Sequence, residues 1–173
     1  GAVRRITGGG LVEHGEDLTF VLAFPAGSPA AGMGTAERYR WLHEAIRSAL
    51  ADCECRIDLA AGGAAEQTGT RLPGPCFANP VPWDLLDAAT GEKLGGGAQR
   101  RSRGAVIHQG SLRLPAALRR PDAAWVDAFL DAISKSPLPL ANEAKARMLE
   151  CAARLEAERY STREWNDGTS GNR

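Results

Sequence analysis

The segment from Gly91 to Leu114 constrains the fold of this chain more than any other part of its sequence. The runs Glu92–Arg101 and Ala105–Leu114 read as two antiparallel strands, and the connection between them is short enough for a hairpin. Three consecutive glycines, Gly95 to Gly97, let another molecule approach the strand backbone beside Lys93. The hairpin is therefore expected to be part of a sheet and one wall of a binding site.

Hydrophobic periodicity and turn residues predict the remaining elements. Strands are expected at Asp17–Phe24, Cys55–Leu59 and Trp83–Asp87, with the end of another at Ala2–Ile6. Helices are expected at Ala36–Ala51, Asp122–Ile133 and Asn142–Arg159, with Thr35 and Asp122 as caps. Loops are expected at Ala26–Gly34 and Ala60–Pro75. This order of elements indicates an α+β fold in a single domain over residues 1–173.

The charge balance and the cysteine content exclude several classes of protein. The chain carries 21 Lys and Arg against 21 Asp and Glu, so no net charge attracts nucleic acid or an anionic membrane. The RRSR turn at 100–103 has no interleaved aromatic residues, which argues against a nucleic-acid patch. No apolar run is long enough to span a membrane. The four cysteines indicate reduced thiols in a cytoplasmic protein, and Cys53 and Cys55 lack the partners of a metal site.

A glycine run near the start of the chain, RRITGGGLVEH at 4–14, is the first candidate site. Glycines that follow a strand can bend sharply and leave backbone N–H groups free for an anion, and Arg4 and Arg5 add positive charge. The alternative is a plain glycine-rich turn. The spacing matches neither a Walker loop nor the dinucleotide-binding fingerprint.

Lys93, Cys76 and the histidines are the other candidates. Lys93 can hold a carboxylate or phosphate, or stabilise developing negative charge, although an isolated lysine is more often solvated. Cys76 lies among prolines; it is a nucleophile if a nearby cation favours its thiolate, and otherwise a semi-buried thiol. His14 and His108 either help to build a site or satisfy backbone groups, and His43 is expected at the helix surface or as a cap.

Together these motifs resemble one protein family. RRITGGGLVEH followed by DLTF at 17–20 is similar to the family's RR-x-[ST]-GGG-x-V-x-H…DLT[FY] loop. CFANP at 76–80, GEKLGGGAQRR at 91–101 and HQGS at 108–111 resemble its second signature, and ERYSTREWN at 158–166 resembles its closing helix. Over nearly its whole length, the chain is identified as a member of the lipoate-protein ligase A and octanoyltransferase group of the biotin/lipoate ligase superfamily.

The resemblance implies a mixed, largely antiparallel sheet that cradles an acyl chain. It also implies protein lipoylation, in which an octanoyl or lipoyl group is placed on a lysine of a lipoyl carrier domain from a 2-oxoacid dehydrogenase or the glycine cleavage H protein. The favoured route is a transferase that needs no cofactor and takes octanoate from acyl carrier protein through a cysteine thioester. The alternative route is an ATP-dependent ligase that makes lipoyl-AMP with magnesium.

Site residues carry over from the family by position. Cys76 matches the nucleophile, and Lys93 matches the lysine of the K-[IL]-x-G motif, from where it would favour the thiolate. The residues expected to bind substrate are Arg5, Thr7, Gly8, Gly9, Gly10 and His14 in the glycine loop, and Gly95, Gly97, Ala98, His108 and Gly110 in the facing wall. No metal ligand is expected on the transferase route.

Two departures from the family pattern qualify this interpretation. The strand–helix–strand unit that precedes the glycine loop in the family is missing, so the chain is expected to be N-terminally incomplete or divergent. A non-catalytic protein that binds lipoate or lipoyl domains is therefore an alternative from a different functional class. Gly15 follows His14 where ligases often carry Asp, which weakens the ATP-dependent route.

Overall fold

A computed structural model describes residues 3–53, 55–61, 76–120, 123–134 and 141–167. The chain separates into two compact units, a larger one of Thr7–Ser136 and a smaller one of Gly1–Ile6 with Pro137–Arg173. Each unit is described by itself, and the single domain over residues 1–173 stays a prediction. Within the described residues, no helix has the length and apolarity needed to cross a membrane.

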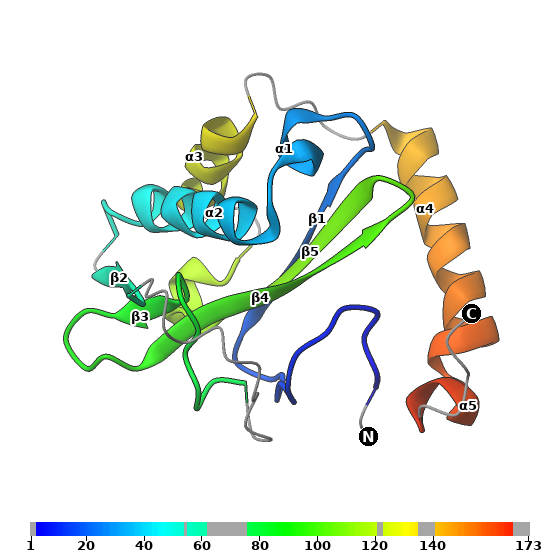
Figure 1. Cartoon of the computed structure of the whole chain (residues 1–173), viewed down its shortest axis with the longest axis horizontal. Coiled ribbons are helices and arrows are strands. Elements are labelled where there is room, and N and C mark those ends of the chain that lie inside the picture. The colour runs from blue at the N-terminus through cyan, green and yellow to red at the C-terminus, as the bar shows by residue number, and fades with distance from the viewer. Residues whose placement is uncertain (1–2, 54, 62–75, 121–122, 135–140, 168–173) are drawn as a thin grey trace. The chain divides into compact units, whose positions relative to one another are not determined.

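Five strands form the sheet of the larger unit, in the order β1-β5-β4-β3-β2 (Figure 1). Their bounds are β1 Leu18–Phe24, β2 Ile57–Leu59, β3 Leu85–Asp87, β4 Lys93–Ser102 and β5 Ala105–Leu112. Every neighbouring pair is antiparallel, and β4 and β5 form the expected hairpin, which closes at the pair Ser102 and Ala105. The α+β fold with a largely antiparallel sheet and flanking helices is confirmed.

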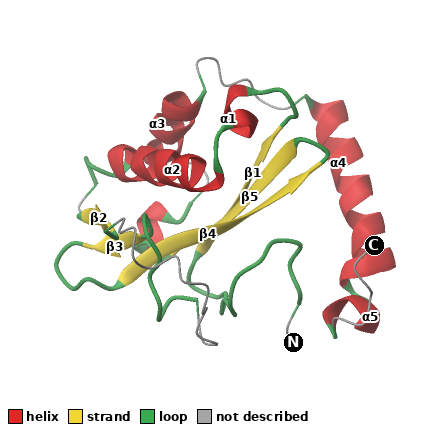
Figure 2. Cartoon of the chain, in the orientation of Figure 1, coloured by secondary structure: helices red, strands yellow, loops and turns green. Residues whose placement is uncertain are grey.

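Two helices cover one face of this sheet, as Figure 2 shows in red against the yellow strands. They are α2, Thr35–Ala49, and α3, Ala124–Ile133, and both have the apolar periodicity that predicted them. The buried core between the helices and the sheet contains Leu42, Ile46, Leu50, Leu85, Leu112, Trp125 and Phe129. Burial of these side chains fixes which face of each strand points inward.

The two faces of the sheet differ in what covers them. Alternate residues of β1, such as Phe20 and Leu22, pack against the core, and in β5 the buried Val106 and Leu112 do the same. The intervening residues Gln109 and Ser111 point the other way. We call the side toward α2 and α3 the inner face and the opposite side the outer face. The outer face carries the side chains that meet the glycine loop.

Several local expectations are corrected at the ends of elements. Helix α2 begins at Thr35 with Gly34 as its N-cap, and the Glu37 carboxylate accepts from the Gly34 N–H at 3.2 Å, so Thr35 is not the cap. Ala123 occupies the cap position of α3, and the expected cap Asp122 lies outside the described residues. Residues 3–6 form no strand, unlike the expected strand end. Of the expected loop at 60–75, residues 62–75 lie outside the described residues.

A short helix interrupts the expected loop at 26–34. It is α1, Pro29–Gly32, and the Ser28 hydroxyl accepts from the Ala31 N–H at its start. The Arg38 guanidinium donates to the carbonyl oxygens of Ala30 and Met33 at 2.9 and 2.8 Å. Arg38 lies five to eight residues from these carbonyl groups and binds their backbone, so the residue types within 26–34 alone did not reveal the helix.

The smaller unit joins the start of the chain to its last helices. These are α4, Asn142–Leu155, a π-helical turn at Glu156–Tyr160, and α5, Arg163–Asn166. The Trp165 indole N–H donates to the Arg4 carbonyl at 2.6 Å, and the Arg4 N–H donates to the Asn166 side-chain oxygen at 2.8 Å. Trp165 and Asn166, which the sequence analysis singled out only by family resemblance, therefore hold Arg4 at the start of the chain.

Candidate functional site

A buried ion pair lies where β3 meets β4. Lys93 Nζ is 2.7 Å from Asp84 Oδ2, and the two side chains are 3% and 0% exposed. Asp84 also accepts from the Val81 N–H at 2.7 Å and from the Tyr39 hydroxyl at 2.5 Å. A carboxylate with three donors, one of them a buried cation, is fixed in position, because each donor satisfies one of its lone pairs.

Tyr39 links this ion pair to the glycine strand. Strand β3 begins at Leu85, opposite Gly95, so the Gly97 N–H lies beyond this end of the β3–β4 ladder. The Tyr39 hydroxyl accepts from that N–H at 2.9 Å while it donates to Asp84. Burial, the charge of Asp84 and, more weakly, Cys76 hold the pKa of Tyr39 far above its ordinary value, so the phenol stays protonated.

The turn that carries Cys76 is held by its main chain on both sides. The Cys76 N–H donates to the Leu11 carbonyl of the glycine loop at 2.8 Å, and Lys93 Nζ donates to the Cys76 carbonyl at 3.0 Å. The next residue, Phe77, lies under the Arg113 guanidinium at 3.8 Å. The structure therefore brings Cys76, Lys93 and the glycine loop together, as expected from the sequence.

The pairing of Lys93 with Asp84 changes what Lys93 can do for Cys76. From the sequence, Lys93 was expected to act as a cation beside the thiol. In the structure, its charge is balanced by the carboxylate of Asp84, so the ion pair has no net charge. An ammonium group has three N–H donors, of which two point to Asp84 and to the Cys76 carbonyl. In the described part of the chain, no third acceptor lies within hydrogen-bond distance. Lys93 Nζ is thus held between two oxygen atoms, and it also lies 5.8 Å from the centre of the Phe77 ring.

The glycine loop reaches the outer face of the sheet through Thr7. Thr7 is buried, and its hydroxyl donates to the Gln109 side-chain oxygen of β5 at 2.8 Å. Gly8, Gly9 and Gly10 are exposed, and Gly9 has φ of 112°, a backbone conformation that residues with a Cβ rarely adopt. Arg5 belongs to the smaller unit and is described only there.

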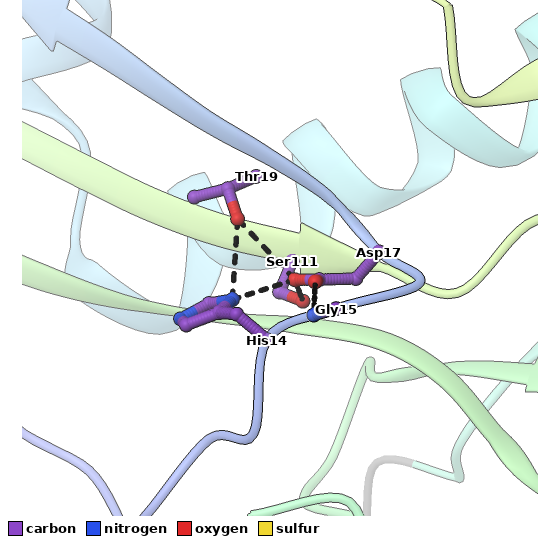
Figure 3. A network of polar contacts seen from close by, with 5 residues as sticks. All are labelled: His14, Gly15, Asp17, Thr19 and Ser111. Atoms are coloured by element: carbon purple, nitrogen blue, oxygen red, sulfur yellow. Dashed lines mark hydrogen bonds and ion pairs between the residues drawn. The ribbon is translucent and has the colours of Figure 1, made fainter. Parts of the chain in front are cut away.

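His14 ends the loop in a network of polar contacts that Figure 3 shows. Its Nδ1 lies 2.7 Å from Asp17 Oδ2, and Asp17 also accepts from the Ser111 hydroxyl at 2.6 Å and the Gly15 N–H at 3.0 Å. Burial alone would raise the pKa of Asp17, but the bonds from Ser111, Gly15 and His14 outweigh it and hold that pKa well below its ordinary value. Asp17 is therefore a carboxylate at any physiological pH.

His108 lies on the inner face, which corrects its expected place in the wall opposite the glycine loop. Its ring is fully buried against Tyr39 and His43 of α2 and is stacked on Phe20 of β1. His43 is also fully buried, not at the helix surface, and its Nδ1 lies 2.6 Å from the Trp83 carbonyl. Burial lowers the pKa of His43 to about 4 and that of His108 to about 3, so both rings are neutral.

The wall glycines mostly serve packing on the inner face. A Cβ added to Gly95 would meet the Leu112 side chain, one at Gly97 would meet the His108 ring, and one at Gly110 would meet the Phe20 ring. Ala98, one residue on from Gly97, points to the outer face by alternation and pairs with Gln109. The glycine against which Asp84 and Lys93 lie is Gly96, where an added Cβ would be 2.7 Å from Asp84 Oδ1.

A substitution at Gly97 tests this packing. We expect Gly97→Ala to lower the free energy of unfolding by about 1–3 kcal/mol, because the new methyl group overlaps the buried His108 ring. Denaturant unfolding followed by circular dichroism measures the change. Gly32→Ala is the matched control, since a Cβ there meets nothing within 4 Å. Equal unfolding free energies for the two variants would show that the His108 ring can move away from the new methyl group without loss of stability.

Asp84 and Tyr39 are the members of the site that sequence reasoning missed. Asp84 falls within the expected strand Trp83–Asp87, and Tyr39 falls within the expected helix Ala36–Ala51. An acidic residue among the apolar residues at the start of a buried strand was the available signal, because such a group needs a buried partner. In the described residues, no group of three or more His, Cys, Asp or Glu side chains has the arrangement of a metal site.

The fold is an antiparallel sheet covered by helices on one face. In it, Lys93 of β4 donates a hydrogen bond to the main chain of Cys76. Residues 1–145 match the model of the lipoyl protein ligase A/B catalytic domain. The chain belongs to this family.

Curated relatives and solved structures are similar to the chain over much of its length. An octanoyltransferase LipM of Exiguobacterium is 32% identical over 157 residues, which cover 88% of this chain and 52% of the relative. An octanoyltransferase LipM of Moorella thermoacetica is 31% identical over 116 residues, 66% of this chain and 41% of the relative. The chain thus spans about half the length of the curated relatives it matches.

Two solved structures have the same fold. A lipoate protein ligase of T. acidophilum with bound lipoic acid superposes with a TM-score of 0.64 at 19% identity, over 96% of this chain and 71% of that one. A lipoate-protein ligase A bound with ATP superposes with a TM-score of 0.62 at 18% identity, over 95% and 70%. At these identities the likeness concerns the fold.

Proposed function

We propose that the protein places an octanoyl group on a lysine of a lipoyl carrier domain, with Cys76 as the intermediate carrier of the acyl group. The observation that carries the proposal is the fixed Cys76 turn, which Lys93 holds at the carbonyl and Leu11 holds at the N–H. The similarity to LipM octanoyltransferases supports the same chemistry. The structural likeness to a bipartite lipoate protein ligase studied with its E2 lipoyl domain supports a lipoyl domain as the acceptor.

In the first half-reaction, the Cys76 thiolate attacks the carbonyl carbon of an acyl thioester such as octanoyl-acyl carrier protein. Negative charge develops on the carbonyl oxygen as the new C–S bond forms; the C–S bond to the donor then breaks, and the donor sulfur leaves as a thiolate that takes a proton from water. Lys93, whose Nζ lies 3.0 Å from the Cys76 carbonyl oxygen, can stabilise that negative charge. In the second half-reaction, the carrier lysine attacks the Cys76 thioester and releases the thiol.

Two of the described carboxylates, those of Asp84 and Asp17, are already bound by protein donors, which supports this route over an ATP-dependent ligase. A ligase uses Mg²⁺, which prefers carboxylate oxygens as ligands. Asp84 is engaged by Tyr39, Val81 and Lys93. Asp17 is engaged by His14, Gly15 and Ser111. Both carboxylates therefore have structural partners, and the transferase route requires neither metal nor nucleotide.

Parallel incubations of the full-length protein test the proposal. One receives octanoyl-acyl carrier protein, another lipoate with ATP and Mg²⁺, and each contains a lipoyl carrier domain. We expect an octanoyl adduct on the enzyme in intact mass spectra, followed by octanoylated carrier, with the thioester donor alone. Carrier modification that requires ATP would identify a ligase instead, and carrier binding without any modification would identify a non-catalytic binding protein.

A further inference from the structure

The His14 imidazole has one nitrogen bound to Asp17 and the other on the exposed side. Its side chain is 55% exposed, whereas that of Asp17 is 4% exposed. Asp17 is ionised and only accepts hydrogen bonds, so neutral His14 carries its proton on Nδ1 and has its lone pair on Nε2. A fixed tautomer with an exposed basic nitrogen is the arrangement that a general base needs.

The support of Asp17 keeps this arrangement rigid. Asp17 immediately precedes β1, and the Ser111 hydroxyl of the neighbouring strand β5 donates to it at 2.6 Å. The Thr19 hydroxyl lies 3.2 Å from Asp17 Oδ2 and 3.3 Å from His14 Nδ1 (Figure 3). The pair of His14 and Asp17, called the dyad below, is therefore held by side chains of two strands, although His14 itself lies in a loop.

An open pocket of about 430 Å³ lies beside the dyad. Three carboxylates and two guanidinium groups line it: Glu13, Glu16, Asp17, Arg113 and Arg119. His14, Gly15 and Leu114 complete the lining. Arg113 is also the cation that lies over Phe77, the residue after Cys76. The Cys76 N–H is bound to Leu11, three residues before His14. Arg113 therefore belongs both to the pocket lining and to the contacts of the Cys76 turn.

An acceptor lysine poses a chemical requirement that this pocket meets. A lysine side chain has an ordinary pKa of about 10.4 and is an ammonium ion near neutral pH, so it must lose a proton before it can attack. The carboxylates of Glu13 and Glu16 attract an ammonium ion, the guanidinium groups of Arg113 and Arg119 in the same lining oppose it, and the His14 side chain is 55% exposed. Cys76 and Lys93 do not supply this base, because one carries the acyl group and the other is a cation bound to Asp84.

We propose that His14, oriented by Asp17, is the general base that deprotonates the attacking carrier lysine, and that the pocket beside it admits this lysine. This rests on the proposed function, in which the acyl group is transferred from Cys76 to a lysine amine. The ammonium gives one proton to His14 Nε2. The amine then forms the C–N bond, the C–S bond to Cys76 breaks, and the second nitrogen proton ends on the departing sulfur. The products are the amide, the Cys76 thiol and an imidazolium that releases its proton to water.

Single-turnover transfer to a lipoyl carrier domain, measured with the full-length protein across pH, tests this role. We expect His14→Gln to form the acyl-enzyme at the normal rate and to transfer the acyl group at least about tenfold more slowly near neutral pH. The deficit shrinks as pH rises, because more carrier lysine is already deprotonated. Asp17→Asn acts in the same direction, since its amide N–H would face Nδ1 and move the imidazole proton to Nε2.

The matched control is Asp58→Asn in β2, at the opposite edge of the sheet, which keeps the normal rate and pH profile. A transfer rate unchanged in His14→Gln, or a deficit independent of pH, overturns the assignment. If the wild type forms no acyl-enzyme but modifies the carrier with ATP, the cysteine route fails, and the pH profile of amide formation still tests His14. If no amide forms with either donor, both proposals fail.

Discussion

Replacing Cys76 by serine is expected to abolish the acyl-enzyme. The hydroxyl of serine is a far weaker nucleophile than a thiolate near neutral pH, and no general base among the described residues is bonded to position 76 to activate it. We expect acyl transfer to the carrier to fall by about 10³-fold or more, as for loss of a catalytic nucleophile elsewhere. Intact mass spectrometry of the enzyme and a carrier octanoylation assay measure the two effects.

Two comparisons make this result specific. The contacts that hold the Cys76 turn involve its main chain and the Phe77 ring, so we expect unfolding of Cys76→Ser to match the parent within about 1 kcal/mol. Cys151→Ser is the matched control, because Cys151 is exposed on α4. An adduct that persists in Cys76→Ser, or one lost from Cys151→Ser, would place the acyl group on a different residue.

The sequence predicted the sheet well because its signals are local. The β4–β5 hairpin follows from two strand-like runs and a four-residue turn, in which Arg103 and Gly104 both have positive φ. The apolar spacing of α2 and α3 likewise reflects the face that each helix buries. Helix α1 was missed because its stability depends on Arg38, which is several residues away and reads as an ordinary surface charge.

The inner position of His108 was also available from the sequence. Val106, His108, Gly110 and Leu112 share one face of β5 by strict alternation, and two of the four are apolar residues typical of a core. The family resemblance placed His108 in the wall that binds substrate, but the alternation of residues along β5 places it on the core side. Alternation also separates Gln109 and Ser111, which contact Thr7 and Asp17, from the core side.

The Asp84 network was beyond sequence reasoning because its members come from separate elements. Tyr39 lies in α2, Asp84 lies before β3, and Lys93 begins β4, so only the folded chain brings them together. Periodicity explained Tyr39 as a core residue, and nothing in its spacing indicated that its hydroxyl binds a carboxylate. Buried polar groups need hydrogen-bond partners, and only the folded structure shows which side chains supply them.

Asp84→Asn is expected to have the largest effect on stability. The amide keeps an acceptor for Tyr39, but its NH₂ group faces the Val81 N–H and the Lys93 ammonium, which leaves a buried cation unpaired. Loss of one partner from a buried pair costs about 3–5 kcal/mol. We therefore expect the free energy of unfolding to fall by that amount in denaturant titrations, and acyl transfer to fall with it because Lys93 no longer has a fixed position.

A double-mutant cycle separates the ion pair from simple loss of packing. Lys93→Met removes the cation while keeping an apolar stem of similar length, so Asp84→Asn combined with Lys93→Met should cost less than the sum of the single variants. Asp58→Asn, exposed in β2, should change stability by no more than about 0.5 kcal/mol. Strict additivity of the two substitutions would mean that Asp84 and Lys93 do not stabilise each other. A non-additive loss means that Asp84 and Lys93 stabilise the fold through their mutual interaction.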